Sequence, residues 1–470
     1  MCESAPIDAE IGIVVPGAGL PRYARATGRT RVTLDNGRGT GDFGNIRRVA
    51  MLSVHTSPIA TLGVKDGGGM NVYVRELSRQ LGRQGIAVDI FTRRSDPYTA
   101  ETVDIGDNVR VVHITAGPPA PLGKEELFAL TDDFAAETAH FGLRDGVSYD
   151  VIHAHYWLSG WVALALRRYW SAPIVQMFHT LAALKEEAAR GAADGRESTL
   201  RLDGERRLID RVDAIVAGNA RERAEIIWWY GGSTPRITTI PCGIDLERFR
   251  PTDRDAARAT LGLGDDPHLL FVGRIDPIKG VDFLIDGYAQ LRAGWTGAGT
   301  PRLIIVGGEL RDGGLGPDLA RVHDRAAALG VADGLIFRGP QPHETLPLYY
   351  AATDFTVVPS RYESFGLVAI ESMACGTPVV ASRAGGLAYT VEDGRNGFLV
   401  PYGDVPTLAA TLDRALTDHA ATPALRAGAL ATAQGYSWAD VARRIRCLYC
   451  QLAIGCGQQT LRRDAVATGD

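Results

Sequence analysis

Short apolar runs alternate with longer amphipathic stretches along most of the chain. An apolar run at 49–54 is followed by an amphipathic stretch at 70–84, a second apolar run at 87–92, and further pairs of the same kind as far as residue 218. Short buried runs separated by stretches of helical period are typical of a parallel β-sheet with helices on both faces. The pattern therefore predicts an α/β fold.

The same alternation begins again near His268. Apolar runs are found at 269–272, 302–306, 335–338, 355–358, 378–381 and 397–400. Between the two series, Pro241, Gly243 and Pro251 interrupt the pattern, as expected of a connection between domains. We expect two doubly wound domains, at 47–245 and 246–435. Ligands of such sheets bind beyond the carboxyl ends of the strands, so the predicted site is the cleft between the domains.

The two ends of the chain differ from this pattern. Residues 1–46 have no sustained periodicity, and we expect a flexible extension. Residues 436–455 are predicted to form a helix that crosses back onto the first domain, and 456–470 a loose tail. Cys447 and Cys450 lie one helical turn apart in this helix, with Cys456 nearby. In the absence of a second cysteine pair or a histidine cluster at zinc-finger spacing, burial in the core is favoured over a metal site.

Composition narrows the possible functions. The 470 residues carry a formal net charge of −5, which gives no overall positive field for nucleic-acid binding. No apolar run is long enough for a transmembrane helix, and the first residues lack the basic region of a signal peptide. Six cysteines in a chain of this length do not indicate a disulfide framework. We expect a cytoplasmic protein without stable membrane insertion.

Two glutamates dominate the candidate chemistry. Glu363 and Glu371 flank the sequence Phe365-Gly366-Leu367, which follows the apolar run at 355–358. Carboxylates accept hydrogen bonds from vicinal hydroxyl groups, so the pair indicates a sugar or ribose ligand. The alternative is two solvated glutamates near a helix N-terminus, where negative charge is favoured anyway.

Two cations follow the strand at 269–272. Arg274 and Lys279 lie in the loop that leads to the next predicted helix. A guanidinium, an ammonium and the N–H groups of a helix N-terminus can together hold a diphosphate and stabilise the charge that develops on it. A pair of surface cations is the alternative, although a lysine at a helix start is poorly placed for the helix dipole.

Other motifs leave more than one interpretation open. The loop at 66–69 brings glycines to a helix start, which suits a phosphate or simply a tight turn, and it matches neither a dinucleotide fingerprint nor a P-loop. His153 and His155 follow a strand and fit either a core position or a ligand. Asp253-x-Asp255 is interpreted as a helix cap.

Together these segments resemble the retaining glycosyltransferases of family 4, which have the GT-B fold of two Rossmann-like domains facing across a cleft. The resemblance covers residues 47–455. The matching motifs are Gly67–Asn71, His153–Gly160, Phe178–Thr180, Gly273–Gly280, and Glu363 and Glu371 with Gly376–Pro378.

The resemblance implies a role for each matching residue. Glu363 would contact hydroxyls of the donor sugar, Glu371 the ribose, and Arg274 and Lys279 the diphosphate. His179 would lie beside the reacting carbon. The implied catalytic residues are His179, Arg274, Lys279 and Glu363, and the implied donor-binding residues are Gly69, Arg274, Lys279, Gln341, Glu363, Phe365, Gly366, Leu367 and Glu371. Members of the family require no catalytic metal, and a UDP-sugar is the donor.

A closer resemblance is to the inositol-phosphate glycosyltransferases within that family. Matching segments are His55–Pro58, Gly68–Tyr73, Leu122–Leu127, His155–Gly160 and His179–Ala183. The resemblance implies UDP-N-acetylglucosamine as donor and 1D-myo-inositol 3-phosphate as acceptor. The implied acceptor-binding residues are Asn71, Lys124, Tyr156, Thr180 and Arg201. Two cations and two hydroxyls also make a good dianion site on chemical grounds alone.

Several alternatives remain open at this point. Sucrose-phosphate synthases share the layout and would transfer glucose from UDP-glucose to fructose 6-phosphate. A sugar-nucleotide binder without activity would not need Arg274, Lys279, Glu363 and Glu371 together. Transfer to a phosphatidylinositol would require an exposed basic amphipathic helix, and none is convincing. A homodimer is an open alternative.

Overall fold

The computed structural model describes residues 46–60, 68–188, 197–311 and 314–467, with side chains described as far as Ile454. The expected N-terminal extension lies outside these residues, apart from Ile46. Asp66 and Gly67 of the first glycine loop and the last three residues of the expected tail also lie outside them.

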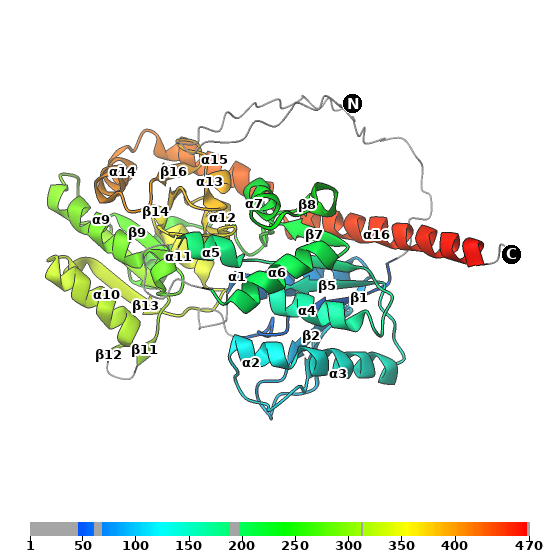
Figure 1. The fold of residues 1–470 in the computed structure, drawn as a ribbon. Coiled ribbons are helices and arrows are strands. Elements are labelled where there is room, and N and C mark those ends of the chain that lie inside the picture. Colours follow the sequence, from blue (N-terminus) through cyan, green and yellow to red (C-terminus); the bar gives the residue numbers. More distant parts are fainter. Residues whose placement is uncertain (1–45, 61–67, 189–196, 312–313, 468–470) are drawn as a thin grey trace, which may run out of the picture. The chain divides into compact units, whose positions relative to one another are not determined.

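Within the described residues, eight strands of the first half form one sheet (Figure 1). The sheet order is β3-β4-β2-β1-β5-β6-β7-β8, and every pairing is parallel except that of β3 with β4. Three of the strands, β5, β6 and β7, are buried along their whole length, which is typical of strands covered on both faces. The strands are β1 (Arg48–Leu52), β2 (Ala87–Arg93), β3 (Thr102–Gly106), β4 (Val109–Ile114), β5 (Val151–His155), β6 (Ile174–Met177), β7 (Ala214–Ala217) and β8 (Ile237–Thr239).

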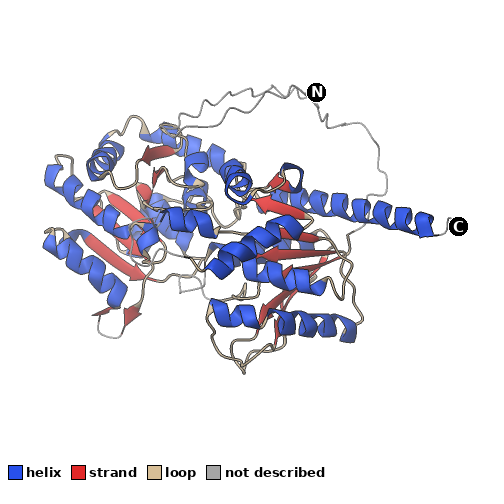
Figure 2. Ribbon diagram, viewed as in Figure 1, coloured by secondary structure: helices blue, strands red, loops and turns tan. Residues whose placement is uncertain are grey.

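Helices separate most of these strands and cover both faces of the sheet (Figure 2). They are α1 (Gly69–Arg83), α2 (Lys124–Ala129), α3 (Thr131–Arg144), α4 (Tyr156–Leu166), α5 (Ala182–Ala188), α6 (Thr199–Arg211) and α7 (Ala220–Tyr230).

The second half contains a six-stranded sheet that is parallel throughout, in the order β13-β10-β9-β14-β15-β16. A separate two-stranded antiparallel sheet pairs β11 (Leu310–Arg311) with β12 (Gly314–Leu315). The six strands are β9 (His268–Val272), β10 (Arg302–Val306), β13 (Leu335–Gly339), β14 (Phe355–Val358), β15 (Val379–Ser382) and β16 (Gly397–Val400). The helices are α8 (Arg254–Leu261), α9 (Val281–Gly294), α10 (Pro317–Ala328), α11 (Leu346–Ala352), α12 (Leu367–Ala374), α13 (Leu387–Thr390), α14 (Val405–Thr417), α15 (Thr422–Gln434) and α16 (Trp438–Ala467).

The strand order reverses once in each sheet. In the first, β1 lies between β2 and β5, and in the second β9 lies between β10 and β14, so the chain leaves neighbouring strands in opposite directions at these points. Such a reversal opens a crevice at the carboxyl edge of the sheet, where ligands bind. The α/β class predicted from the sequence is confirmed, and the loops after β1, β5, β9 and β14 are placed to form a site.

Some elements differ from the sequence prediction. The sequence pattern from about Lys124 to Phe141 predicts a single helix, but the structure divides this segment into α2 and α3, and the Thr131 hydroxyl donates to the Phe128 carbonyl at the division. Helix α4 begins at Tyr156, earlier than expected. Neither α7 nor β8 was predicted.

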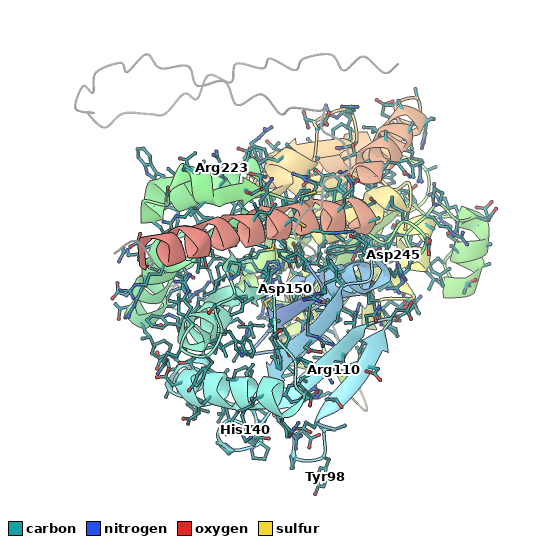
Figure 3. All side chains as sticks on the ribbon, turned by 90° about the vertical axis from the view of Figure 1, so that its right-hand side faces the viewer. Tyr98, Arg110, His140, Asp150, Arg223 and Asp245 are labelled. Atoms are coloured by element: carbon teal, nitrogen blue, oxygen red, sulfur yellow. The ribbon has the colours of Figure 1, made fainter. Side chains whose placement is uncertain are left out.

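The last helix joins the two halves. Backbone at Ile244 pairs with Ser437 just before α16 begins, and the ring of Trp438 meets that of Tyr73 on α1 at 5.3 Å. Farther along, the Tyr449 hydroxyl lies 2.7 Å from His153 Nδ1 on β5. Figure 3 shows α16 running lengthwise across the side of the molecule that faces the viewer. The helix continues to Ala467, beyond the end expected from its apolar pattern.

The structure tests the interpretations given to Asp253, to the cysteine pair and to His153. Asp253 is the N-cap of α8, where its carboxylate accepts from the Ala256 N–H at 2.8 Å, so the capping interpretation is confirmed. Cys447 is exposed and Cys450 is half-buried, so the expected burial of this pair is wrong for Cys447, whose position on α16 faces solvent. His153 is a buried core residue bonded to Tyr449. No helix among the described residues has both the length and the apolar character to cross a membrane.

Candidate active site

Two loops of the second half are locked together at the carboxyl edge of its sheet. Gly280 ends the loop after β9 with φ = 72°, and a Cβ added there would lie 2.0 Å from the Pro359 carbonyl oxygen, so only glycine permits this approach. The Arg361 N–H donates to the Ile278 carbonyl at 2.8 Å. The loop after β9 is thereby held against the loop after β14.

This contact brings the first cation and the first glutamate together. Lys279 Nζ lies 2.6 Å from Glu363 Oε2, and the two side chains are only 25% and 18% exposed. Arg274 lies beside Asp276, with 3.8 Å between Nη1 and Oδ2. The sequence predicted that Lys279 and Glu363 belong to one ligand site, but it did not predict that they form an ion pair. In the structure, an entering phosphate would share the ammonium of Lys279 with this carboxylate.

The second glutamate is buried between two partners. His343 Nε2 lies 2.8 Å from Glu371 Oε1, and the Tyr350 hydroxyl donates to Oε2 at 2.7 Å. Burial, and then the Glu371 charge, raise the pKa of Tyr350, which remains a donor. Each carboxylate oxygen keeps a second lone pair for a ligand hydroxyl. Neither His343 nor Tyr350 was identified as a site residue from the sequence, because neither belongs to a recognisable motif.

The turn between the glutamates is shaped by glycines. Gly366 has φ = 88° and precedes α12, which begins at Leu367 and whose first N–H groups lack partners within the helix. Gly385 comes so close to the Glu363 carbonyl that an added Cβ would lie 1.9 Å from its oxygen, and the Gly386 N–H donates to that oxygen at 2.8 Å. The backbone around Glu363 is therefore fixed from two sides.

A cavity of about 210 Å³ lies over these residues. It includes six of the residues that the sequence assigned to the donor, and Gln341 at its wall donates through Nε2 to the Arg338 carbonyl at 2.6 Å. Phe365 and Gly366 do not line it, although they carry Leu367, which does. The lining is Gly68, Gly69, Val72, Val272, Gly273, Arg274, Lys279, Val306, Gly307, Pro340, Gln341, His343, Leu346, Leu367, Val368 and Glu371.

A second cavity of about 260 Å³ adjoins the first. The two share Gly68, Gly69, Arg274 and Lys279, so these residues form the boundary between them. The second cavity brings Glu363 of one half together with all five acceptor residues expected from the sequence, which belong to the other half. Its lining also contains His55, Thr56, Met70, His179, Lys185, Asp276, Ile278, Tyr362 and Ser364.

Cations surround Tyr156 in the second cavity. Tyr156 begins α4 with φ = 73°, an uncommon conformation for a bulky residue. The Arg201 guanidinium lies 5.0 Å from the centre of its ring and Lys124 Nζ lies 5.6 Å from it. Lys185, which the sequence reasoning missed, adds a third cation and pairs with Glu197 at 2.6 Å.

Arg201 is held rigidly. It is 3% exposed, and its guanidinium donates to Glu205 at 2.8 Å, to Glu197 at 2.9 Å and to the Thr180 hydroxyl at 3.1 Å. Burial lowers the pKa of Arg201, but the neighbouring anionic groups outweigh it, so the guanidinium stays charged. Arg201 therefore orients Thr180 and adds fixed positive charge to the cavity wall.

Burial keeps the imidazoles of His55 and His179, in the second cavity, neutral. Burial lowers the pKa of His55 to about 3, and Lys124, His179 and Arg201 add to the effect. Burial likewise lowers the pKa of His179 to about 3. His179 has φ = 61°, and its Nε2 lies 2.9 Å from Nδ1 of His155. A neutral imidazole so placed can hydrogen-bond a sugar but cannot supply charge.

Asn71 supports the cavity from behind. Its amide group donates to the Thr56 hydroxyl at 2.8 Å and to the Ser57 carbonyl at 2.6 Å, while its oxygen accepts from the Gly68 N–H at 3.1 Å. Both amide protons are thus used within the protein. Asn71 holds Thr56 in the wall of the second cavity.

One contact between the halves was not expected from the sequence. Asn219 caps α7, where its oxygen accepts from the Glu222 N–H at 2.9 Å, and its amide donates to the Ser364 carbonyl at 2.7 Å. A side chain of the first half therefore holds the residue next to Glu363. Asn before a helix is a recognisable cap signal, but its second partner cannot be foreseen from local sequence.

The described residues contain no group of three or more histidine, cysteine or acidic side chains arranged to hold a metal ion. The His153 and His155 pair therefore does not extend to a metal site within them.

Two family models match the chain. The model described as Glycosyltransferase Family 4 matches residues 67–248, and that described as Glycosyl transferases group 1 matches residues 253–429. Among curated relatives, D-inositol 3-phosphate glycosyltransferase 2 of Catenulispora acidiphila is 43% identical over 406 residues, covering 83% of this chain and 95% of the relative. The D-inositol 3-phosphate glycosyltransferase of Geodermatophilus obscurus is 44% identical over 395 residues, covering 83% and 86%.

Solved structures agree with this result. A sucrose-phosphate synthase from Thermosynechococcus elongatus matches with a TM-score of 0.79 and 34% identity, over 87% of this chain and 100% of that one. Anabaena HepE in complex with UDP and glucose matches with a TM-score of 0.65 and 22% identity, over 85% and 98%. The resemblance drawn from the motifs and the GT-B fold it implied are confirmed.

Proposed function

We propose that this chain, which belongs to glycosyltransferase family 4, transfers a hexosyl group from a UDP-sugar to a phosphorylated small polyol with retention at the anomeric carbon. That it is a glycosyltransferase follows from family membership. The donor proposed is UDP-N-acetylglucosamine, and the acceptor 1D-myo-inositol 3-phosphate. The curated relatives that carry this acceptor in their names support the choice.

One observation carries the proposal, namely two adjoining cavities with Arg274 and Lys279 on their common boundary. The diphosphate of a donor would lie at this boundary, because the two cations stabilise the charge that develops as it leaves. The nucleoside would extend toward Gln341 and Glu371, with Glu371 on the ribose hydroxyls. The sugar would lie at Glu363, whose carboxylate is already oriented by Lys279.

The acceptor would enter the second cavity. Its phosphate would meet Lys124 and the hydroxyls of Tyr156 and Thr180, with Arg201 behind them as fixed charge. Lys185 is the additional cation that the structure brings to this set. A dianion is bound most strongly where several charge-assisted donors converge, and this wall has that character.

The proposed reaction is a front-face displacement. The bond between the anomeric carbon and the diphosphate oxygen breaks, and its electron pair leaves with UDP. The acceptor hydroxyl oxygen forms the new bond on the same face, and its proton passes to a donor phosphate oxygen. His179, neutral because burial lowers its pKa to about 3, would bond the sugar beside the reacting carbon.

Measurement of UDP release tests the proposal. UDP-N-acetylglucosamine and UDP-glucose are each combined with inositol 3-phosphate, fructose 6-phosphate, free inositol and phosphatidylinositol. Turnover with UDP-N-acetylglucosamine and inositol 3-phosphate, and none with free inositol, is expected. Turnover with fructose 6-phosphate alone would replace this acceptor by that of the second candidate, which the 34% identity to a sucrose-phosphate synthase favours. Turnover only with unphosphorylated acceptors would refute the phosphate site.

A further inference from the structure

We propose that the first half has a second anion site, on its outer surface, that binds a small phosphorylated molecule. The site is a hollow of about 480 Å³ bounded by α2, α3, α4 and α6. It shares no residue with either cavity of the active site. Its lining is Phe128, Ala129, Thr131, Asp132, Trp161, Leu164, Ala165, Arg167, Arg168, Arg207 and Arg211.

The rim of the hollow is strongly basic. Four guanidinium groups line it against the single carboxylate of Asp132, which pairs with Arg168. Arg167 pairs with Asp213, which does not line the hollow, at 2.7 Å. Within the described part of the chain, no ion pair is formed by Arg207 or Arg211. The positive charges of Arg207 and Arg211 are not compensated and lie near those of Arg167 and Arg168. A bound anion would reduce the repulsion among the four guanidinium groups.

The chemistry of the wall indicates phosphate attached to an apolar group. Guanidinium groups bind phosphate through two parallel hydrogen bonds, and four of them at one rim suit the two negative charges of a phosphate. Arg207 lies 4.9 Å from the centre of the Trp161 ring, and Phe128 meets the edge of the same ring at 5.3 Å. The volume lies within the usual range for small-molecule sites. A compact ligand with a flat or apolar part and one or more phosphates fits best.

The helices that bound the hollow also build the acceptor cavity. Lys124 is the first residue of α2, Tyr156 is the first of α4, and Arg201 lies in the first turn of α6, while the hollow lies toward the other ends of these helices. Phe128 stacks on Trp157, the neighbour of Tyr156, at 5.5 Å and 26°. An anion that draws Arg207 and Arg211 toward α4 would therefore act on the acceptor cavity through a packed aromatic contact. We expect it to change the acceptor KM and leave the donor KM unchanged.

Inorganic pyrophosphate is the probe, titrated by calorimetry into the full chain at constant ionic strength. Because the active site also attracts pyrophosphate, variants are used to distinguish binding at the active site from binding at the hollow. Lys124→Ala/Lys279→Ala weakens the active-site component only, because it removes one cation from the acceptor wall and one from the boundary that would hold a diphosphate. Arg207→Gln/Arg211→Gln removes the component assigned to the hollow. Arg206→Gln/Arg221→Gln is the matched control, because it deletes the same charge from exposed residues that do not line the hollow.

The Lys124→Ala/Lys279→Ala chain is expected to retain one pyrophosphate site, and adding Arg207→Gln/Arg211→Gln should weaken that site at least tenfold. The control pair should change the affinity less than threefold. Equal weakening by both pairs would show a diffuse charge effect, and no residual site in Lys124→Ala/Lys279→Ala would show that the hollow does not bind; either result overturns the proposal. A melting temperature measured for each variant identifies loss of folding. None of these readouts requires the acceptor to be known, so they are independent of the proposed reaction.

Discussion

The amide of Asn219 donates to the Ser364 carbonyl at 2.7 Å, which fastens the start of α7 in one half to the residue beside Glu363 in the other. The same side chain caps α7 through its oxygen. One residue thus combines a local stabilising role with control over the position of Glu363, the carboxylate that we propose binds the sugar.

Asn219→Asp separates the two roles. Aspartate caps helices as well as asparagine does, but it cannot donate to Ser364, so turnover should fall about tenfold while the melting temperature changes little. Asn219→Ala removes the cap as well and should also cost about 1 kcal/mol of stability. Steady-state kinetics and thermal unfolding of both variants make the comparison. Full activity of Asn219→Asp would mean that the contact does not position Glu363.

Lys279→Ala is expected to lower kcat by about two to three orders of magnitude, because it removes charge stabilisation at the departing diphosphate. It also releases Glu363, to which Lys279 is paired at 2.6 Å. Arg395→Ala, which breaks an exposed ion pair with Glu392, is the matched control and should leave kcat unchanged. A change confined to KM would contradict the assigned role of Lys279.

Lys124→Ala should raise the acceptor KM about tenfold or more with a smaller change in kcat, since it removes one charge-assisted contact to the acceptor phosphate. Lys185→Ala should act in the same direction but less, because Lys185 is already paired with Glu197. Initial rates at varied acceptor and saturating donor measure both effects. An unchanged acceptor KM in both variants would place the phosphate elsewhere.

The sequence predicted the architecture because short buried runs and their helical separators are local signals, and a parallel sheet leaves few alternative arrangements. It also located the loops that carry Lys279 and Glu363 and the helix that carries Glu371. The sequence could not predict hydrogen bonds that depend on long-range packing. Those of His343 and Tyr350 with Glu371, and that of Asn219 with Ser364, involve segments that contain no recognisable motif. Helix α7 was missed because Trp228 is exposed, so its apolar positions do not form a clean amphipathic stripe.

Glu222 should give the protein an unusual pH dependence. Burial raises the pKa of Glu222 to about 7. The hydrogen bond from the Gly218 N–H lowers this pKa, and the charge of Glu225 raises it further. Because the folded-state pKa is raised, the stability linked to the protonated form is fully present below about pH 4.5 and is lost as pH rises through about 7. The melting temperature of Glu222→Gln relative to the natural chain should therefore increase from pH 5 to pH 8. A constant difference would show that Glu222 does not titrate in this range.

His153 should act in the opposite direction. Burial, and then the charge of His179, lower the pKa of His153 to about 3. A lowered folded-state pKa gives stability that is present above about pH 6.5 and lost as pH falls toward 3. His153→Gln should be destabilised at pH 8, where it loses the ring that contacts Tyr449, and the difference should narrow by pH 5. Thermal unfolding across this range tests the sign.

The crossing helix has a consequence for biosynthesis. His153 lies in the middle of the first sheet, yet its partner Tyr449 is translated 296 residues later. While the ribosome synthesises the second half, the first half must wait with an apolar face uncovered, where Ile445, Leu448 and Tyr449 will later be buried. Apolar surface that is exposed in this way favours aggregation, so the first half is vulnerable from the completion of its sheet until α16 is synthesised. A chain that ends before residue 438 would leave this apolar face uncovered even though every residue of the first sheet is present.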